Sequence, residues 1–521
     1  SFINVSWLFH PDTLVRSLTH DGHGDSVGMK HNSQWDLRPH RDRLIFVDEA
    51  LLRQWQRLTG HNGPVDQTPL LAPATIVEQE AIAALANADI RRGTEELQIS
   101  SGYNEKTAKD DGVIRWATGP RGSLDEVILQ GPHFSIATPF AKQPNIPCRN
   151  NQDWSAWDLR KLPPDAVPVT NYERACDKET YFAYQDHWIS RWPLVRQRKT
   201  GSAPESPRYP NSEEIDRDLR ARHVKRYTKF YRLAWRRMIP FNTERSLFAA
   251  LIPPGPAHVH TVHSLALGDN RRTALAAGFW AALPLDYLLR ITGRSDLGYA
   301  EANSMPVADP RHPLAPALLL RILRLNCLTD AYADLWAEIF PGGQLEGEES
   351  GDPGVEIESL AGEEWAVEWP GLPPLSADIG PEWTAATPLR TERARRAALV
   401  ELDALVAVWL GMSVDHLIAI YRSRFPVLAD RESRMWFDAN GRRIAGDYNT
   451  FGYGQTKDHF EQLVAHLDPG INGPVPEGYS APFYKADREA EYRQAHAVFS
   501  KRLHESGWRA PFTRGGKGGE S

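Results

Sequence analysis

Hydrophobic and polar positions alternate differently in the two halves of the chain. Near the N-terminus, an apolar run at Leu44–Val47 predicts a short strand, and Asp48 opens a helical pattern directly after it. A second helical pattern covers Pro73–Arg91. Over 96–139 short apolar runs such as IRWATGP predict strands, and strand-like runs return within 213–267. This half therefore predicts a mixture of helices and strands.

Helical periodicity dominates the second half. Helical patterns cover 271–292 and 312–340. Two amphipathic helices, RTERARRAALVELDALVAVWLG and SVDHLIAIYRSRF, follow later, separated by Gly411, and Ser413 is a natural N-cap for the second. A last helix covers about 485–506. The chain thus predicts a mixed α/β (α+β) fold in which a strand-containing part precedes a helical C-terminal region.

Two segments interrupt these patterns. The first is acidic and rich in glycine and proline, as in GGQLEGEESGDPGVEIES, which is typical of a flexible linker. The second is the glycine-rich C-terminal tail, which we expect to be disordered. The predicted parts are an N-terminal segment, a strand-containing domain, the linker, a helical C-terminal region and the tail, at 1–100, 101–340, 341–388, 389–510 and 511–521.

Composition places the chain among ordinary globular proteins. It has 521 residues, 41% of them hydrophobic and 24% charged, and a formal net charge of −7. The three cysteines lie far apart and form no CxxC pair, so a disulfide framework and a cysteine-rich zinc site are both disfavoured. The longest uncharged apolar run, Ala274–Leu285, is too short to span a bilayer. We therefore expect a cytoplasmic protein without a membrane partner.

Three histidines lie close together in the stretch Arg245–Leu267, which reads RSLFAALIPPGPAHVHTVHSLAL. Its two strand-like runs flank a Pro-Pro-Gly-Pro turn and predict a hairpin. His258 and His260 would share one strand face and could bind a metal together. No third ligand with a recognisable spacing lies nearby, and HExxH is absent. Polar strand-face residues that contact a partner or solvent are the favoured interpretation, and no metal site is predicted.

The segment before this hairpin is strongly basic. LRARHVKRYTKFYRLAWRR, at 219–237, carries eight Arg or Lys and no acidic residue, and four aromatic residues are interleaved with them. Such a pattern suits phosphates and adjacent bases, whereas the alternative is a solvated basic face. The rest of the chain is acidic, which favours nucleic acid. The candidate DNA-binding residues are Lys225, Arg226, Lys229, Arg232, Trp235, Arg236, Arg237, Asn242, Arg245, His258 and His260.

Nucleotide and cofactor motifs are missing from the sequence. GxGxxG and GxxxxGK[ST] do not occur, and neither does an Asn/Asp/Ser-Pro-Pro-aromatic motif. No catalytic and no cofactor-binding residue is therefore predicted in this chain. A short and degenerate nuclease cluster remains open, although no stretch stands out.

Four segments together resemble a known family. They are LQGPHFSIATPFAKQPN at 129–145, the block at 235–265, the FWAALPLDYLLRITGRSDLGYAEANSMPV segment at 279–307, and the block at 401–428. In order and texture they resemble the C-terminal half of large bacterial N6-adenine DNA methyltransferases, the single-chain enzymes of type IIG restriction-modification and related phage-defence systems. The resemblance covers most of 120–450.

The resemblance implies a division of labour. In that family a Rossmann-like domain binds S-adenosylmethionine, and an Asn/Asp-Pro-Pro-aromatic motif holds the flipped adenine; this chain has neither motif. We therefore expect its 101–340 part to be the target-recognition domain for double-stranded DNA. The S-adenosylmethionine-binding domain would lie before the abrupt start at Ser1 or on another polypeptide, and this chain alone would be inactive and hold no cofactor. The alternative is a stand-alone DNA-binding or scaffold protein of a defence complex, without methyltransferase activity.

Overall fold

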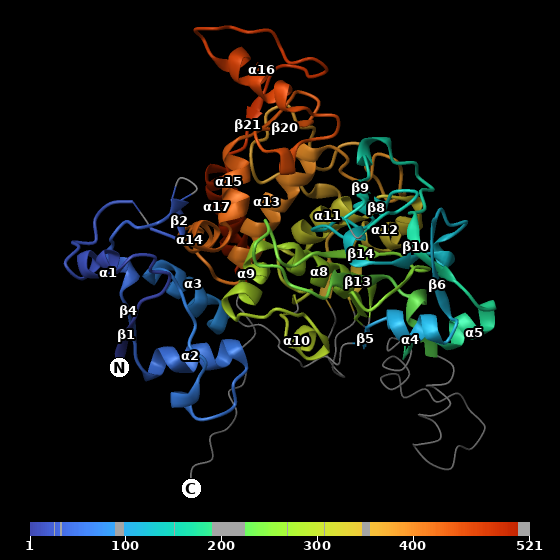
Figure 1. Ribbon diagram of the computed structural model, residues 1–521, viewed down its shortest axis with the longest axis horizontal. Coiled ribbons are helices and arrows are strands. Elements are labelled where there is room, and N and C mark those ends of the chain that lie inside the picture. The colour runs from blue at the N-terminus through green and yellow to red at the C-terminus, as the bar shows by residue number, and fades with distance from the viewer. Residues whose placement is uncertain are drawn as a thin grey trace.

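The protein has a mixed α/β structure. The computed structural model describes residues 1–25, 27–31, 34–88, 98–150, 152–189, 224–267, 269–306, 308–345 and 355–508. Within these ranges helices surround several small and mostly antiparallel sheets (Figure 1), which confirms the mixed α/β class. The predicted tail at 511–521 lies outside the described residues.

The N-terminal residues form a lobe at one side of the molecule (Figure 1). Strands β1 and β4 of this lobe pair antiparallel, with Ile3 of β1 opposite Phe46 of β4. The Asp48 carboxylate accepts a hydrogen bond from the Leu51 amide at 2.8 Å, so the predicted helix start is confirmed. The elements of the lobe are β1 (Phe2–Asn4), α1 (Pro11–Leu18), β2 (Lys30–His31), β3 (Gln34–Trp35), β4 (Ile45–Val47), α2 (Glu49–Thr59) and α3 (Ile76–Asn87).

A four-stranded antiparallel sheet lies at the centre of the molecule. Its strand order is β14 (Ala249–Ile252), β13 (Arg232–Arg236), β16 (Val262–Ala266) and β5 (Gln98–Ser100). Helix α8 (Asn270–Ala281) covers one face, where Trp280 meets Trp235 of β13 edge-on, with ring centroids 5.0 Å apart. Because β13 is buried on both faces, its side chains pack inward rather than forming a surface.

The predicted hairpin over Arg245–Leu267 is wrong. The two apolar runs do form β14 and β16, but β13 inserts between them and pairs with both. After the Pro-Pro-Gly-Pro turn the chain first forms β15 (Ala257–His258), which pairs in parallel with β7 (Ile128–Leu129). The turn therefore leads into a neighbouring strand pair, because β13, which precedes β14 in sequence, already occupies the place beside β14 that a hairpin partner would take.

Small strand pairs and short helices lie next to this sheet, on the side of the molecule away from the N-terminal lobe (Figure 1). β6 and β10 pair antiparallel and place Trp116 opposite Tyr172. The elements are α4 (Glu105–Asp110), β6 (Ile114–Gly119), β8 (Lys142–Pro144), β9 (Trp154–Ala156), β10 (Thr170–Arg174), α5 (Lys178–Ala183), β11 (His187–Ile189) and β12 (Val224–Arg226).

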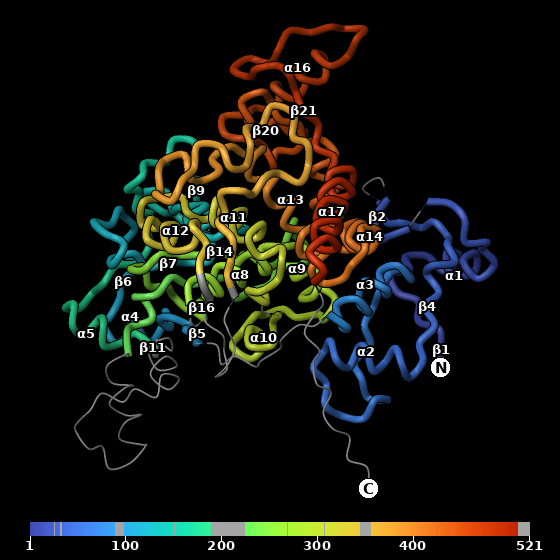
Figure 2. Tube along the Cα trace, turned by 180° about the vertical axis from the view of Figure 1, so that it is seen from behind, coloured from blue at the N-terminus to red at the C-terminus, as the bar shows by residue number. Residues whose placement is uncertain are grey.

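Helices from the second half of the chain pack behind the sheet (Figure 2). The predicted helix at 271–292 is divided at Ala282 into two helices, and the helices on either side of Gly411 form as predicted, the second capped by Ser413. The helices are α9 (Leu283–Ile291), α10 (Tyr299–Asn303), α11 (Ala315–Asn326), α12 (Ala333–Ile339), α13 (Glu392–Trp409), α14 (Val414–Arg424), α15 (Pro426–Ser433) and α17 (Arg488–Glu505). One hydrophobic core joins them to the sheet and to the N-terminal lobe.

A small sheet projects from these helices. It consists of β19 (Met435–Phe437), β20 (Arg443–Ala445) and β21 (Tyr484–Lys485), with α16 (Lys457–Leu467) at the far end of the projection (Figure 1). It has small apolar clusters of its own, among them Ile444, Leu463 and Tyr479. The C-terminal region, which was predicted as helical, therefore contains a small sheet as well.

The expected linker is packed over most of its described length. Strands β17 (Gly343–Leu345) and β18 (Val355–Ile357) pair antiparallel, and 346–354 lie outside the described residues. Beyond them Leu360, Val367 and Leu375 are buried in the main core. The prediction of a flexible linker is therefore wrong for 355–388, because widely spaced apolar side chains in an acidic segment still reach the core.

A single buried carboxylate holds this segment in place. Oε1 of Glu401 on α13 accepts hydrogen bonds from the amides of Ala366 and Val367 and from the indole of Trp369, each at 2.9 Å. Its other oxygen accepts two bonds from the guanidinium of Arg321 on α11, at 2.8 and 2.6 Å. Both charged side chains are fully buried.

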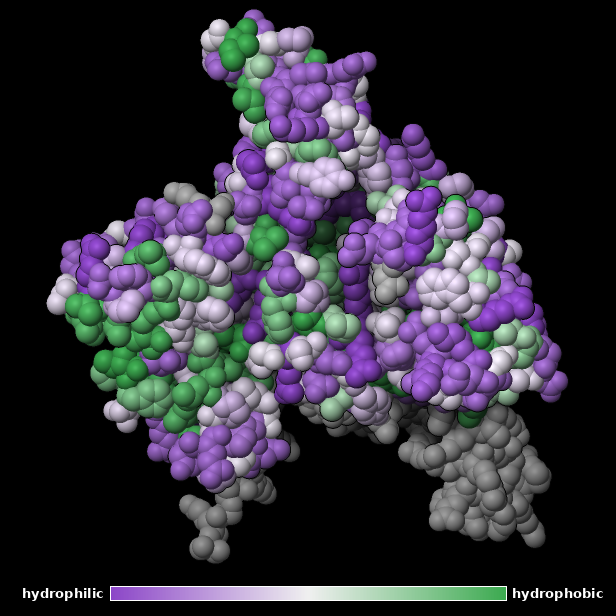
Figure 3. Space-filling model, viewed as in Figure 1, coloured by the Kyte–Doolittle hydropathy of each residue, from purple (hydrophilic) through white to green (hydrophobic). Residues whose placement is uncertain are grey.

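Apolar side chains gather on the surface of the N-terminal lobe (Figure 3). The exposed ones include Phe2, Ile3, Val15, Leu18 and Phe46. Within the described ranges no single helix is long and apolar enough to cross a membrane; only α8 and α9, bent by 65° at their junction, meet that length and composition together.

We expect Glu401→Ala to lower the free energy of unfolding by about 3–5 kcal/mol, because the substitution leaves the buried Arg321 charge with only the more distant carboxylate of Glu363, 4.0 Å away. Urea denaturation measures this loss, and limited proteolysis should then cut first near Trp369. Glu505→Ala is the matched control, since this exposed glutamate only pairs with Lys501 on the same helix, and its loss should cost less than about 1 kcal/mol. Equal stability of the two variants would contradict the role given to Glu401.

Candidate nucleic-acid interface

The described part of the basic segment is distributed over β12 and β13. Residues 219–223 lie outside the described residues. Lys225 is exposed on β12. The Arg226 guanidinium lies over the ring of Phe182, 3.4 Å from its centroid, and exposed Lys229 lies 4.0 Å from a carboxylate oxygen of Asp125. Lys225 and Lys229 thus remain accessible to a phosphate.

Two of the predicted DNA contacts belong to the protein interior. Arg232 is fully buried, donates to the carbonyls of Phe230 and Pro256, and lies over the ring of Tyr227. Burial lowers the pKa of Arg232 to about 10. The indole of Trp235, also fully buried, donates to the Leu297 carbonyl at 2.9 Å. Neither side chain is positioned to contact DNA, because β13 lies in the middle of the sheet.

The next two arginines already have partners. The Arg236 guanidinium lies over the ring of Phe248 and donates to the Phe134 carbonyl, and burial lowers its pKa to about 10. Arg237 is partly exposed, and its Nε lies 3.0 and 2.8 Å from the two carboxylate oxygens of Asp296. A phosphate would have to compete with Asp296 for Arg237.

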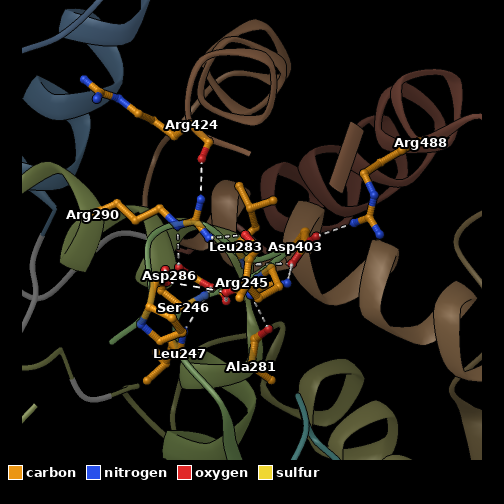
Figure 4. Close-up of polar contacts among 12 residues, drawn as sticks. Arg245, Ser246, Leu247, Ala281, Leu283, Asp286, Arg290, Asp403, Arg424 and Arg488 are labelled. Atoms are coloured by element: carbon orange, nitrogen blue, oxygen red, sulfur yellow. Dashed lines mark hydrogen bonds and ion pairs between the residues drawn. The ribbon is translucent and has the colours of Figure 1, made fainter. Parts of the chain in front are cut away.

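Arg245 is a core residue and not a surface contact. Its Nε donates to a carboxylate oxygen of Asp286 at 2.9 Å, and a terminal nitrogen donates to the Ala281 carbonyl at 2.8 Å (Figure 4). Arg245 is buried, as is Asp286, so this prediction of a DNA contact is corrected. Asn242, by contrast, is exposed.

The predicted histidine face does not form. His258 is fully buried and its Nε2 lies 2.8 Å from the hydroxyl of Ser264, whereas His260 lies in the turn beyond β15 and is partly exposed. Burial holds the pKa of His258 well below its usual value. His263 is also buried, and neither ring nitrogen has a partner among the described residues. Nor do three His, Cys, Asp or Glu side chains of the described part gather where they could hold a metal ion.

A pocket lies beside this region, between β6, β10 and the segment that follows β13. Its volume is about 500 Å³, which is in the range of small-ligand sites. Trp116, 47% exposed, meets Tyr172 edge-on with ring centroids 5.1 Å apart. Trp154 lies on another wall and meets the buried ring of His133 edge-on at 4.8 Å. Aromatic rings therefore line this pocket, which we call the aromatic pocket.

Polar side chains complete the aromatic pocket. The Tyr172 hydroxyl donates to Oε1 of Glu105 at 2.7 Å, and burial, together with this bond, raises the pKa of Tyr172. The Asn171 amide donates to Oε1 of Gln130 at 3.1 Å and accepts a bond from the Thr118 hydroxyl at 2.8 Å. These bonds fix the aromatic and amide groups in one arrangement.

Two buried polar atoms of the pocket residues lack a partner among the described residues. They are Nε of Arg236 and the hydroxyl oxygen of Thr261, and both residues line the pocket. A buried donor without a partner costs about 1–3 kcal/mol, so such atoms are uncommon in folded proteins. Their position makes the aromatic pocket the best candidate for a ligand site.

Only one pocket residue, Arg236, was among the residues predicted from the sequence. Trp116 belongs to the IRWATGP run that was predicted as a strand, but its partner Tyr172 lies on a strand more than fifty residues later. Strand pairing at that separation leaves no local periodicity. The chain has 17 tryptophans, which is compatible with an aromatic contact surface, but their number gives no position for it.

No known family model matches the chain, and no curated protein is significantly similar to it. Its function is therefore inferred from the geometry of the aromatic pocket and its surroundings.

The buried histidines predict acid sensitivity. Burial lowers the pKa of His263 to about 4, whereas in the unfolded chain it titrates near 6.5. The unfolded state then binds the extra proton, so stability falls as pH drops from about 6.5 to 4 and this contribution levels off below that range. His263→Gln should flatten the pH dependence of the unfolding free energy by up to about 1.4 kcal/mol per pH unit between pH 6 and 5. His504 is exposed, so the control variant His504→Gln should show the same pH dependence of the unfolding free energy as the parent. If the curve of His263→Gln also runs parallel to that of the parent, the prediction is contradicted.

Proposed function

We propose that this chain binds DNA through the aromatic pocket, as the target-recognition part of an adenine-specific (N6) DNA methyltransferase in a bacterial restriction-modification or phage-defence system. The observation that carries the proposal is the pocket itself, with Trp116, Trp154 and Tyr172 on its walls and amide and carboxylate groups among them. Bases offer flat π-faces to aromatic rings and hydrogen-bonding edges to amides and carboxylates.

Exposed cations on α4 and β6, two elements that contribute residues to the pocket, support this proposal, and we call Lys106 and Lys109 of α4 the rim lysines. Helix α4 contributes Glu105 to the pocket and carries Lys106 and Lys109, both exposed. The Lys109 ammonium lies 5.9 Å from the centroid of the Tyr172 ring. Arg115 on β6 is also exposed, although Glu173 pairs with it at 2.5 Å. Phosphates on either side of a bound base would meet Lys106 and Lys109 first.

Methyl transfer belongs to a separate catalytic domain in this proposal. That domain would bind S-adenosylmethionine and carry the chemistry, because the present sequence lacks both a glycine-rich turn for the donor and the Pro-Pro motif for the adenine. The present chain would select the DNA site and hold the duplex in register, in the cytoplasm.

A second candidate function is a stand-alone DNA-binding or scaffold protein of a defence complex. The apolar side chains on the N-terminal lobe, such as Phe46 and Val15, favour contact with another protein. Both candidates share the DNA-binding pocket. A neighbouring gene that encodes a methyltransferase domain supports the first candidate, and a complete gene without one supports the second.

The rim lysines give the test of DNA binding. If Lys106 and Lys109 contact phosphates, a Lys106→Ala/Lys109→Ala variant should bind every duplex more weakly and flatten the slope of log affinity against log salt by about two. The slope is measured by fluorescence anisotropy between about 50 and 200 mM salt.

The matched control removes the same charge elsewhere. Lys457 and Lys501 are exposed on α16 and α17 and pair only with glutamates of their own helices. A Lys457→Ala/Lys501→Ala variant should keep the parental affinity and salt slope. Equal behaviour of the two double variants, or no duplex binding by the parent, would refute the proposed interface.

A further inference from the structure

We infer that the aromatic pocket receives a single nucleotide base that has left the stack of the bound DNA. This inference rests on the proposed function and names the ligand of the same site. A base inside a duplex is covered on both faces by its neighbours, so it can enter an aromatic pocket only after unstacking. A pocket that takes such a base needs open ring surface and unpaired polar groups.

Open ring surface is present at Trp116. Its side chain remains 47% exposed although Tyr172 packs against it edge-on. Met238, 73% exposed, lines the same pocket and adds a flexible apolar surface. An exposed tryptophan beside an exposed methionine is costly in water, and stacking of a planar base would cover both.

Unpaired polar groups are present as well. Oε1 of Gln130 accepts the bond from Asn171, while no partner contacts its amide nitrogen in the described part of the chain. One oxygen of Glu105 accepts the Tyr172 bond, and the second has no partner within the described ranges. With the hydroxyl of Thr261 and Nε of Arg236, the pocket offers both donors and acceptors. The edge of a base needs both kinds of group.

The neighbouring residues hold the pocket open. The ring of His133 is fixed between two backbone groups, since its Nδ1 accepts from the backbone N–H of Gln130 at 2.9 Å and its Nε2 donates to the Val169 carbonyl at 3.1 Å. Burial lowers the pKa of His133 to about 4, so it stays neutral near pH 7. Trp154 rests edge-on against this fixed ring. The wall that Trp154 forms is therefore preformed, and a base would enter without rearranging it.

A bulged duplex provides the experiment. The full chain is titrated with a fluorescent duplex of about 30 base pairs, and with the same duplex carrying one unpaired nucleotide at its centre. The unpaired base needs no opening energy, so we expect the bulged duplex to bind at least about 5-fold more tightly. Trp116→Ala should remove this preference, Trp116→Phe should retain part of it, and the salt slope of both variants should stay parental, since no phosphate contact is lost.

Trp35→Ala is the matched control, because Trp35 is equally exposed (52%) but stacks on Phe9 in the N-terminal lobe. It should keep the preference. Equal binding of matched and bulged duplexes by the parent overturns the inference and leaves the proposed DNA binding intact. A preference that survives Trp116→Ala overturns it too, since the base would then lie elsewhere. Absence of binding to either duplex overturns the inference and the proposed function together.

Discussion

Pairing of buried charges is the constraint on which the rest of the structure depends. Arg245 bonds Asp286 of α9 and lies 3.8 Å from Asp403 of α13, and Asp403 in turn accepts a bond from Arg488 of α17 at 2.8 Å (Figure 4). All of these side chains are buried, and a buried charge without its partner costs several kcal/mol. Although burial alone would raise the pKa of the neighbouring Glu432, two arginines outweigh it and hold that pKa far below its usual value. These pairs therefore favour the observed arrangement of the sheet and the helices over arrangements that would separate the charges.

This network also fixes one wall of the aromatic pocket. The carboxylate of Asp286 accepts a hydrogen bond from the backbone N–H of Ser246 at 2.7 Å, and the Ser246 hydroxyl donates one to the carbonyl of Pro240 at 2.6 Å. Pro240 and the preceding Ile239 line the pocket. The segment between β13 and β14 is thus held at its far end by buried charge pairs, although it runs along the surface. A recognition site benefits from such support, because binding then orders less of the chain.

The sequence predicted what depends on local patterns. Amphipathic spacing and Ser413 located α13 and α14, since a helix forms its hydrogen bonds within a few residues. The sequence patterns did not predict the features that depend on which side chains become buried. The segment at 355–388 is acidic, yet its few large apolar residues and the carboxylate of Glu401 bring it into the core. Strand-like runs were recognised over Arg245–Leu267, but which strand pairs with which depends on contacts distant in sequence.

Arginine positions were a poor guide to the proposed DNA-contacting surface. Most of the positively charged residues are arginines, and many serve the interior: Arg324 donates to the carbonyls of Thr387 and Ala386, and Arg395 donates to those of Leu325 and Leu389. A count of charges along the chain therefore overstates the positive surface available to a phosphate. If this protein binds DNA, a few rim lysines supply the attraction to the backbone, and a larger share of the affinity must come from contact with the base itself. An aromatic pocket with unpaired donors and acceptors is the kind of site that such a balance requires.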